Sequence, residues 1–199
     1  MTTWMHEQRL QAAFDAVIGS GACRVVDLGC GDGDLFLRLA AHPAIQELVG
    51  VDICTESLER LKARLAKLPA PTGRTELRAG SMTVAHPTLS GFDCATLIET
   101  IEHIDPSHLS QLERAVFGQM RPRMVVLTTP NAEFNVLLGV PRHRFRHPDH
   151  RFEWPRARFR QWGDRVGKAF GYEVGYSDIA GCHPDLGGAS QMAVFEQRR

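Results

Sequence analysis

Residues 25–33 read Val-Val-Asp-Leu-Gly-Cys-Gly-Asp-Gly, a short apolar run that ends in a cluster of glycines. The apolar run predicts a buried strand, and the segment from Leu35 to Ala41 predicts a helix directly after it. Glycines at a strand-to-helix turn allow the backbone to turn tightly and to approach a ligand closely. These residues therefore predict an α/β fold with a ligand site at the turn.

Strands and helices alternate along the rest of the chain. Six more strands are expected, at Glu47–Ile53, Thr75–Ala79, Phe92–Ile98, Met124–Thr128, Tyr172–Ser177 and Gln191–Glu196. Further helices are expected at Leu10–Ile18, at Thr55–Leu68, from Asp105 to about Phe117, and at Pro155–Ala169. The alternation predicts a seven-stranded, mostly parallel sheet with helices on both faces. The last two strands have no helix between them and predict an antiparallel hairpin at the C-terminal edge.

Length and composition are those of one soluble domain, residues 1–199. The formal net charge is zero, so the chain is not a polycation that binds nucleic acid indiscriminately. Its five cysteines include no Cys-x-x-Cys pair, which argues against a disulfide framework or a cysteine zinc site and favours the reducing cytoplasm. We expect no signal peptide, and no apolar run approaches the ~20 residues that a membrane span needs.

The glycine cluster has the spacing Gly-x-Gly-x-Gly, at Gly29, Gly31 and Gly33. The dinucleotide fingerprint Gly-x-Gly-x-x-Gly fails because its third glycine is replaced by Asp34, which disfavours an NAD-linked oxidoreductase. Asp27 precedes the loop and suits a cationic ligand, such as the amino group of a methionine moiety.

A second acid and a serine follow the next two strands. Asp52 ends the second strand, where a carboxylate can accept hydrogen bonds from both ribose hydroxyls of a nucleoside. Ser81 follows the third strand on the same edge and is a candidate partner for adenine, with local turn capping as the alternative. The two acids and the glycine loop together resemble the S-adenosylmethionine site of class I methyltransferases. The alternative is a glycine turn that binds nothing.

A second motif, Glu99-Thr-Ile-Glu102-His103, follows the fourth strand. On a helix these two carboxylates and the imidazole share one face, with isoleucines on the opposite face. Such a face is a plausible half-shell for a divalent cation. The alternative is a solvated helix face whose acids favour the helix dipole.

Four motifs in the order found here resemble the Hen1 family. They are Asp27–Gly33, Glu99-x-x-Glu102-His103, Thr129-Pro130-Asn131-x-Glu133-Phe134-Asn135 and Asp149-His150-x-Phe152-Glu153-Trp154. The resemblance runs from about Val25 to the final strand and departs at Pro155, where family members commonly have Thr. Hen1 enzymes methylate the 2′-oxygen of the 3′-terminal ribose of small RNAs, so the resemblance implies a Rossmann-like class I methyltransferase with that activity.

The resemblance also implies residue roles. It implies that the ligands of one divalent cation, which are also needed for catalysis, are Glu99, Glu102, His103 and His150. It implies that S-adenosylmethionine is held by Asp27, Gly29, Gly31, Gly33, Asp52 and Ser81. Mixed carboxylate and imidazole ligands favour Mn²⁺ or Co²⁺, whereas abundance favours Mg²⁺. His143 and His147 receive no role, and His103 remains an alternative general base if it does not bind the metal.

The resemblance implies an RNA substrate, small or cleaved, with a free 3′-hydroxyl. Microbial members act on RNA awaiting repair and eukaryotic members on silencing RNA. Larger bacterial members carry an additional ligase-activating half, so we expect any coupling to RNA repair or end processing to need a separate protein partner.

Basic residues are concentrated in the late part of the chain. From Arg142 to Lys168 there are nine basic and three acidic residues, an excess of six positive charges. This excess suits a phosphate backbone, and we expect segment 129–170 to be an insertion and helix that bind substrate and metal. Phe145, Phe152 and Trp154 are candidates for stacking on bases, with core packing as the alternative.

Two other functions remain open. The same fold serves metal-independent methyltransferases of small molecules, in which Glu99 and Glu102 would be surface residues. A chain of this kind can also be a non-catalytic protein that binds RNA ends. Retention of activity after chelation would favour the first alternative, and absence of donor binding would favour the second.

Overall fold

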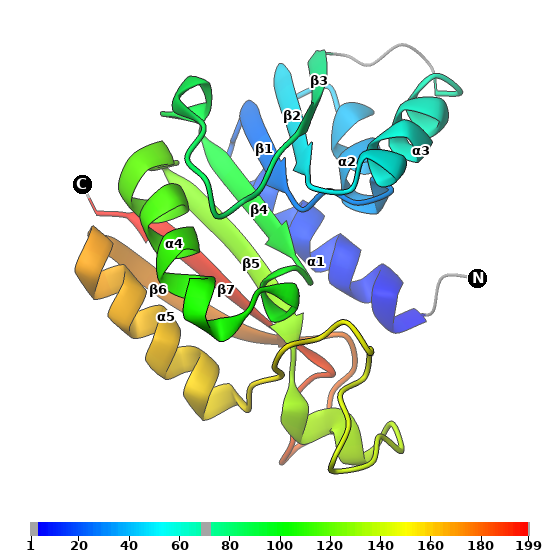
Figure 1. The fold of residues 1–199 in the computed structure, drawn as a ribbon, viewed down its shortest axis with the longest axis vertical. Coiled ribbons are helices and arrows are strands. Elements are labelled where there is room, and N and C mark those ends of the chain that lie inside the picture. The colour runs from blue at the N-terminus through cyan, green and yellow to red at the C-terminus, as the bar shows by residue number, and fades with distance from the viewer. Residues whose placement is uncertain (1–3, 69–72, 199) are drawn as a thin grey trace.

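The computed structural model describes residues 4–68 and 73–198. They contain a seven-stranded sheet with the order β3-β2-β1-β4-β5-β7-β6 (Figure 1). The strands are β1 Arg24–Leu28, β2 Glu47–Asp52, β3 Arg74–Ala79, β4 Cys94–Ile98, β5 Met124–Pro130, β6 Tyr172–Ile179 and β7 Ser190–Gln197. Strand β7 runs antiparallel to both β5 and β6, and the other neighbours are parallel. The predicted sheet with its antiparallel C-terminal hairpin is confirmed.

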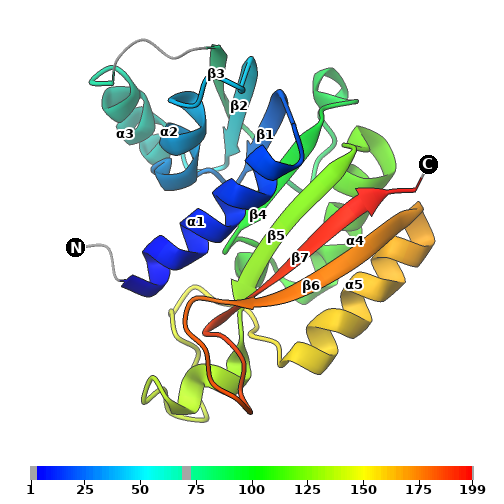
Figure 2. The same cartoon turned by 180° about the vertical axis from the view of Figure 1, so that it is seen from behind.

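Helices cover both faces of the sheet. The α-helices are α1 Trp4–Gly19, α2 Asp34–Ala40, α3 Thr55–Leu65, α4 Leu109–Glu113 and α5 Arg156–Phe170. Helices α1, α2 and α3 lie on one face, and α4 and α5 lie on the other (Figure 2). Short 3₁₀ turns occur at Pro87–Leu89, Ile101–His103, Pro106–His108 and Ala132–Val136, and a π-helical turn at Arg114–Met120. Among the described residues, none of the helices combines the length and apolarity that a membrane crossing requires.

Alternation along the central strands divides the core into two layers. Val25 packs with the apolar residues of α1, α2 and α3, whereas its neighbour Val26 packs with those of α4 and α5. Leu48 and Val49 divide in the same way. Because successive side chains of a strand point to opposite faces, the doubly buried part of each strand is a run of apolar residues, Val25-Val26 in β1 and Leu48-Val49 in β2, instead of an alternation with polar residues.

Three expected helices differ from those in the structure. Helix α1 begins at Trp4 instead of Leu10, and helix α3 ends at Leu65 instead of Leu68. The helix expected from Asp105 to Phe117 is divided into a 3₁₀ turn, α4 and a π-helical turn. The Asp105 carboxylate accepts the Ser107 amide at 2.9 Å and so caps the 3₁₀ turn. The π-helical turn ends at Arg121, whose φ is +46°.

The expected helix over residues 99–104 is wrong. Strand β4 ends at Ile98, and Glu99 has a φ of +52°, which no helix accommodates. Only Ile101–His103 is helical, and as a 3₁₀ turn. Ile101 is nevertheless buried, so it anchors the segment in the core. Glu99, Glu102 and His103 are therefore brought together by a sharp backbone turn and not by helical periodicity.

Residues 131–154, here called the lobe, extend beyond the C-terminal end of β5 (Figures 1 and 2). The Asn131 side-chain amide donates to the carbonyls of Leu186 at 2.7 Å and Gly188 at 2.9 Å, in the β6–β7 connection. Asn131 also pairs as an isolated parallel bridge with Trp154, which joins the two ends of the lobe. The lobe is thus fixed beside the edge of the sheet where parallel strands end.

Candidate functional site

The glycine turn after β1 has the backbone conformation that its sequence indicates. Gly29, Gly31 and Gly33 have φ values of +75°, +51° and +86°. A Cβ at Gly29 would lie 2.5 Å from Thr100 Cγ2, and one at Gly33 would collide with Leu61. A Cβ at Gly31 would meet no atom within 4 Å. Gly29 and Gly33 therefore allow close packing, and Gly31 faces open space.

Asp27 lies at the end of β1 and is only 3% exposed. Its Oδ1 accepts a hydrogen bond from the Thr96 hydroxyl at 2.7 Å. Burial raises the pKa of this carboxyl to about 6, although the bond from Thr96 opposes the shift. A buried carboxylate with one neutral partner is a suitable counter-charge for the ammonium group of a ligand.

Asp52 stabilises the glycine turn from the end of β2. Its Oδ2 accepts the Gly31 amide at 2.7 Å, and its Oδ1 accepts the Cys54 amide at 2.8 Å. Each carboxylate oxygen retains a further acceptor position. Asp52 therefore both shapes the turn and remains able to accept hydroxyl groups.

Two cavities meet at Gly29. One, of about 200 Å³, is lined by Arg9, Asp27, Gly31, Gly33 and Glu99. The other, of about 190 Å³, is lined by Asp52, Ser81, Met82, Thr100 and His103. Because both include Gly29, an elongated ligand can occupy the two cavities across the glycine turn. Larger hollows of the surface lie away from this turn.

Ser81 lines the second cavity, but its hydroxyl is engaged locally. It lies 2.7 Å from the Thr83 hydroxyl and accepts the Thr83 amide at 3.2 Å. The structure thus shows the local turn contacts that were the alternative for Ser81, and it also places the residue beside Asp52.

Glu99 and Glu102 are two neighbouring acids with few partners. Glu99 Oε2 accepts from Arg9 Nη1 at 2.8 Å and from the Ser190 hydroxyl at 3.4 Å. Glu102 is fully buried, and its Oε2 accepts from the Thr129 hydroxyl at 2.9 Å. Burial and the negative charge of Glu99 raise the pKa of Glu102 well above its usual range.

One oxygen of each acid has no hydrogen bond. Within the described part of the chain, buried Oε1 atoms of Glu99 and Glu102 lack any partner. Leaving a buried carboxylate oxygen unpaired costs several kcal/mol, on the order of the penalty for an uncompensated charge. Two such oxygens on neighbouring acids fit a divalent cation, which would supply the missing charge.

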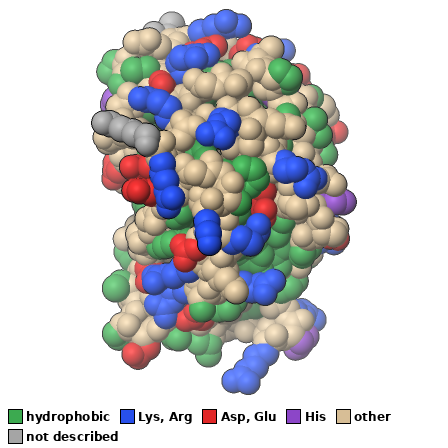
Figure 3. Space-filling view, turned by 90° about the vertical axis from the view of Figure 1, so that its left-hand side faces the viewer, with side chains coloured by type: hydrophobic (Ala, Val, Ile, Leu, Met, Phe, Trp, Pro, Cys, Tyr) green, Lys and Arg blue, Asp and Glu red, His purple; other side chains and the backbone are tan. Residues whose placement is uncertain are grey.

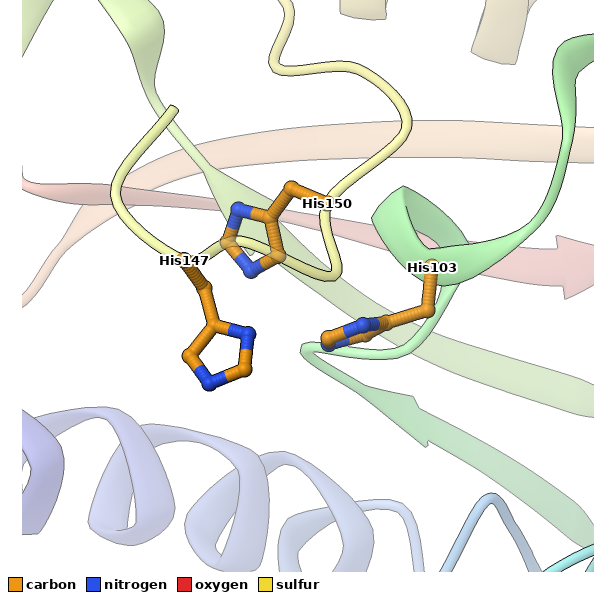
Figure 4. Close-up of side chains that lie close together, drawn as sticks. All are labelled: His103, His147 and His150. Carbon is orange, nitrogen blue, oxygen red and sulfur yellow. The ribbon is translucent and has the colours of Figure 1, made fainter. Parts of the chain in front are cut away.

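Three histidines lie close together at the 3₁₀ turn Ile101–His103 and the lobe (Figure 4), and the group of converging ligand atoms that they form does not include Glu99 or Glu102. Ligating nitrogens of His103, His147 and His150 lie within 4.8 Å of one another. The rings of His103 and His150 are 4.8 Å apart, and burial lowers the pKa of His103. The Glu102 carbonyl accepts the Arg151 amide at 2.7 Å, which fixes the lobe against the 3₁₀ turn. The structure therefore brings His150 to His103, as the sequence motifs implied.

Glu153 orients His150. Its Oε1 lies 2.6 Å from His150 Nδ1, and Glu153 also accepts from the Asn135 side-chain amide at 2.6 Å and the Arg146 amide at 2.7 Å. With the proton on Nδ1, the lone pair of His150 is on Nε2. A carboxylate that fixes a histidine tautomer in this way is common behind metal-ligating imidazoles.

Arg9, Arg146 and His147 are three residues of this region that sequence reasoning missed. Arg9 is 90 positions from Glu99 along the chain, so no local pattern could reveal their pairing. Arg146 donates to the Ala189 carbonyl at 2.6 Å and also bonds Asn131 and Asn135. A signal for His147 did exist, in the short spacing His147-Pro148-Asp149-His150.

The sheet order and the glycine turn define a class I S-adenosylmethionine-dependent methyltransferase. Consistent with this class, a family model described as a methyltransferase domain matches residues 25–123. A solved methyltransferase domain of the bacterial protein CtHen1-C is 35% identical, with a TM-score of 0.87 over 98% of this chain and 100% of that chain. The chain belongs to the Hen1 family of methyltransferases.

Longer relatives contain the same region. The chain is 39% identical, over 98% of its length, to a Small RNA 2′-O-methyltransferase of Gallus gallus, and it covers 54% of that protein. The crystal structure titled small RNA methyltransferase HEN1 is 33% identical with a TM-score of 0.88, and this chain covers 25% of it. The chain thus spans about half the length, or less, of these full relatives.

Gly31→Ala and Gly33→Ala should separate donor binding from folding. The methyl group at Gly31 enters open space, so we expect affinity for S-adenosylmethionine to fall about tenfold or more. The unfolding free energy of the Gly31→Ala variant should fall by only about 1 kcal/mol, because alanine is strained at the positive φ of this position. Gly33→Ala should lose about 2–3 kcal/mol from the collision with Leu61. Calorimetry and urea denaturation measure the two effects, and unchanged donor affinity in Gly31→Ala would contradict the assignment.

Donor binding should depend on pH through Asp27. Its pKa of about 6 means that the carboxylate, which attracts an ammonium group, is lost as the pH falls. We expect affinity for S-adenosylmethionine to fall by up to about tenfold per pH unit below that value. The pKa of Asp27 is higher in the folded protein than its ordinary value of 3.8. Asp27 should therefore lower the free energy of unfolding progressively as the pH rises from about 4 to about 6. Asp27→Asn should bind weakly at every pH, and a wild-type pH profile in that variant would exclude the role.

Proposed function

We propose that this chain transfers the methyl group of S-adenosylmethionine to the 2′-oxygen of the 3′-terminal ribose of a small or cleaved RNA. One observation carries the proposal: the cavity beside Asp52 and Ser81 is also lined by His103. A donor in that cavity would lie against the group of acids and histidines. Family membership supports the same activity, since the relative from Gallus gallus is named a Small RNA 2′-O-methyltransferase.

The donor site is formed by Asp27, the three glycines of the turn, Asp52 and Ser81. Asp27 faces the ammonium group of the methionine part, and Asp52 accepts the ribose hydroxyls. Gly31 leaves room for the donor, as its open Cβ position indicates. Glu99 and His103 also line the two cavities, so a donor held there would lie beside them.

Glu99, Glu102, His103 and His150 are the proposed ligands of one divalent cation. When bound, such a cation lowers the pKa of a ribose hydroxyl and so makes it a better nucleophile. The unpaired Oε1 atoms of both acids support this role. Two imidazoles with two carboxylates favour Mn²⁺ or Co²⁺ over Mg²⁺ by intrinsic affinity, although the abundance of Mg²⁺ in cells keeps it a candidate.

The site also explains preference for a 3′-hydroxyl. An internal nucleotide or a 3′-phosphate carries a bulky, charged phosphoryl group on the 3′-oxygen, and that group would have to enter the poorly solvated space next to Glu102. Loss of its hydration there costs several kcal/mol. A free 3′-hydroxyl adds no charge and is the form that the site accepts.

Part of the basic segment is available for the RNA backbone. Arg142, Arg144 and Arg151 of the lobe are exposed, whereas Arg146 and Arg156 are tied to partners within the protein. Basic side chains also extend along the α5 side of the molecule, interspersed with acids (Figure 3). The excess of charge read from the sequence therefore overstates the number of free cations.

Of the three candidate stacking residues, only Phe145 remains free to contact a base. It is 46% exposed, whereas Phe152 and Trp154 are 7% and 8% exposed and stack on each other in the core. Core packing, the alternative for these two aromatics, is what the structure shows. Contacts to phosphates and one aromatic ring carry little sequence information, so we propose broad sequence tolerance.

The other functions make distinct predictions. A metal-independent methyltransferase would retain activity after chelation, but the expectation that Glu99 and Glu102 are surface residues in it is wrong for Glu102, which is fully buried. A non-catalytic RNA-end binder would not bind the donor. The free thiols of all five cysteines suit the reducing cytoplasm as its location. Any role in RNA repair or end processing would involve a further protein partner.

The proposal predicts methyl transfer only to a free RNA end. An RNA oligomer with a 3′-hydroxyl should be labelled by radioactive S-adenosylmethionine in the presence of Mn²⁺, and the same oligomer with a 3′-phosphate should not. Chelation should abolish the labelling, and Glu102→Gln should reduce it by at least about a hundredfold. Equal labelling of the two oligomers would refute end recognition. Full activity in the chelator would favour the metal-independent alternative.

A further inference from the structure

Three imidazoles, and not two, converge next to the 3₁₀ turn Ile101–His103. His103, His147 and His150 are the one group of three histidines, cysteines or acids within the described residues whose ligating atoms converge in this way. His147 lies 5.9 Å from His103 and 5.6 Å from His150, measured between ring centroids. Figure 4 shows the rings of the two lobe histidines beside that of His103. His147 has no part in the function proposed so far.

Contacts on both sides of His147 fix its position. Arg146 precedes it and holds the lobe to the β6–β7 connection, through the carbonyl of Ala189 at 2.6 Å. Asp149, two residues later, donates its amide to His147 Nδ1 at 3.2 Å, and its carboxylate lies 3.7 Å from the same atom, where it would accept the proton on Nδ1 when Nε2 binds a cation. His147 is therefore not a random surface side chain, although 54% of its side chain is exposed.

We propose that His147 is a third imidazole ligand of the divalent cation. This inference rests on the proposed function, in which the cation is held by Glu99, Glu102, His103 and His150. Imidazole nitrogen favours later transition metals such as Co²⁺ and Zn²⁺, whereas carboxylate oxygen favours Mg²⁺ and Mn²⁺. The third imidazole shifts the site of this chain toward Co²⁺ and Zn²⁺. Its exposure places it at the rim, where it completes the shell without blocking the donor cavity.

The test is a titration of the metal-free full chain with Co²⁺ or Mn²⁺ alone, by calorimetry and by Co²⁺ absorption. His147→Ala should weaken Co²⁺ binding about tenfold or more, weaken Mn²⁺ binding less, and change the Co²⁺ spectrum. His143→Ala is the matched control, since His143 is exposed in the same lobe and lies outside the group of three. It should bind both metals as the wild type does.

A second variant keeps the inference falsifiable. His147→Asp replaces the nitrogen ligand by oxygen, so it should bind both metals but with a lower ratio of Co²⁺ to Mn²⁺ affinity than the wild type. Wild-type Co²⁺ affinity and spectrum in His147→Ala would overturn the proposal. The titration contains neither RNA nor donor, so its result is independent of the test of RNA methylation.

Discussion

The buried carboxylates of Glu99 and Glu102 are neighbours whose negative charges oppose each other in a site with little solvent. Arg9 and Thr129 each supply one hydrogen bond, and one oxygen of each acid remains unpaired. A hydrophobic pair of similar size would stabilise the fold more, so this arrangement indicates a functional requirement. Elements around the carboxyl ends of the parallel strands hold these two carboxylates in place.

The elements that surround the acids come from distant parts of the chain. Helix α1 supplies Arg9, β5 supplies Thr129, and β7 supplies Ser190. The lobe supplies His150, which Glu153 orients at 2.6 Å. Since Arg146 and Asn131 hold the lobe to the β6–β7 connection, the antiparallel hairpin that follows the last helix also positions the site.

Much of the fold follows from local signals. The apolar strands, the glycine turn and the absence of a helix before β7 determine the sheet and its antiparallel edge. Local pattern failed at Glu99, because its φ of +52° depends on how β4 ends against β5, where the Glu99 amide donates to the Thr128 carbonyl at 3.1 Å. Local pattern left open whether Phe152 and Trp154 stack on bases or pack in the core, because their burial depends on packing against α5.

The sequence motifs predicted which residues form the site but not how those residues contact one another. Motifs implied that Glu102, His103 and His150 act together, and the structure brings His150 to His103 across about fifty residues of sequence, held by the bond from Arg151 to Glu102. The pairing of Arg9 with Glu99 depends on tertiary contacts alone. No periodicity or spacing encodes contacts between segments so far apart.

We propose that a divalent cation compensates the negative charge of Glu99 and Glu102. Urea denaturation with and without Mn²⁺ tests it without RNA or donor. At about a hundredfold excess of Mn²⁺ over its dissociation constant, the unfolding free energy of the wild type should rise by about 2.7 kcal/mol. Glu102→Gln, which resembles the protonated form of that acid, should be at least as stable as the wild type without metal and should respond little to Mn²⁺. If Mn²⁺ does not raise the unfolding free energy of the wild type, or raises that of Glu102→Gln equally, no cation binds to these two acids.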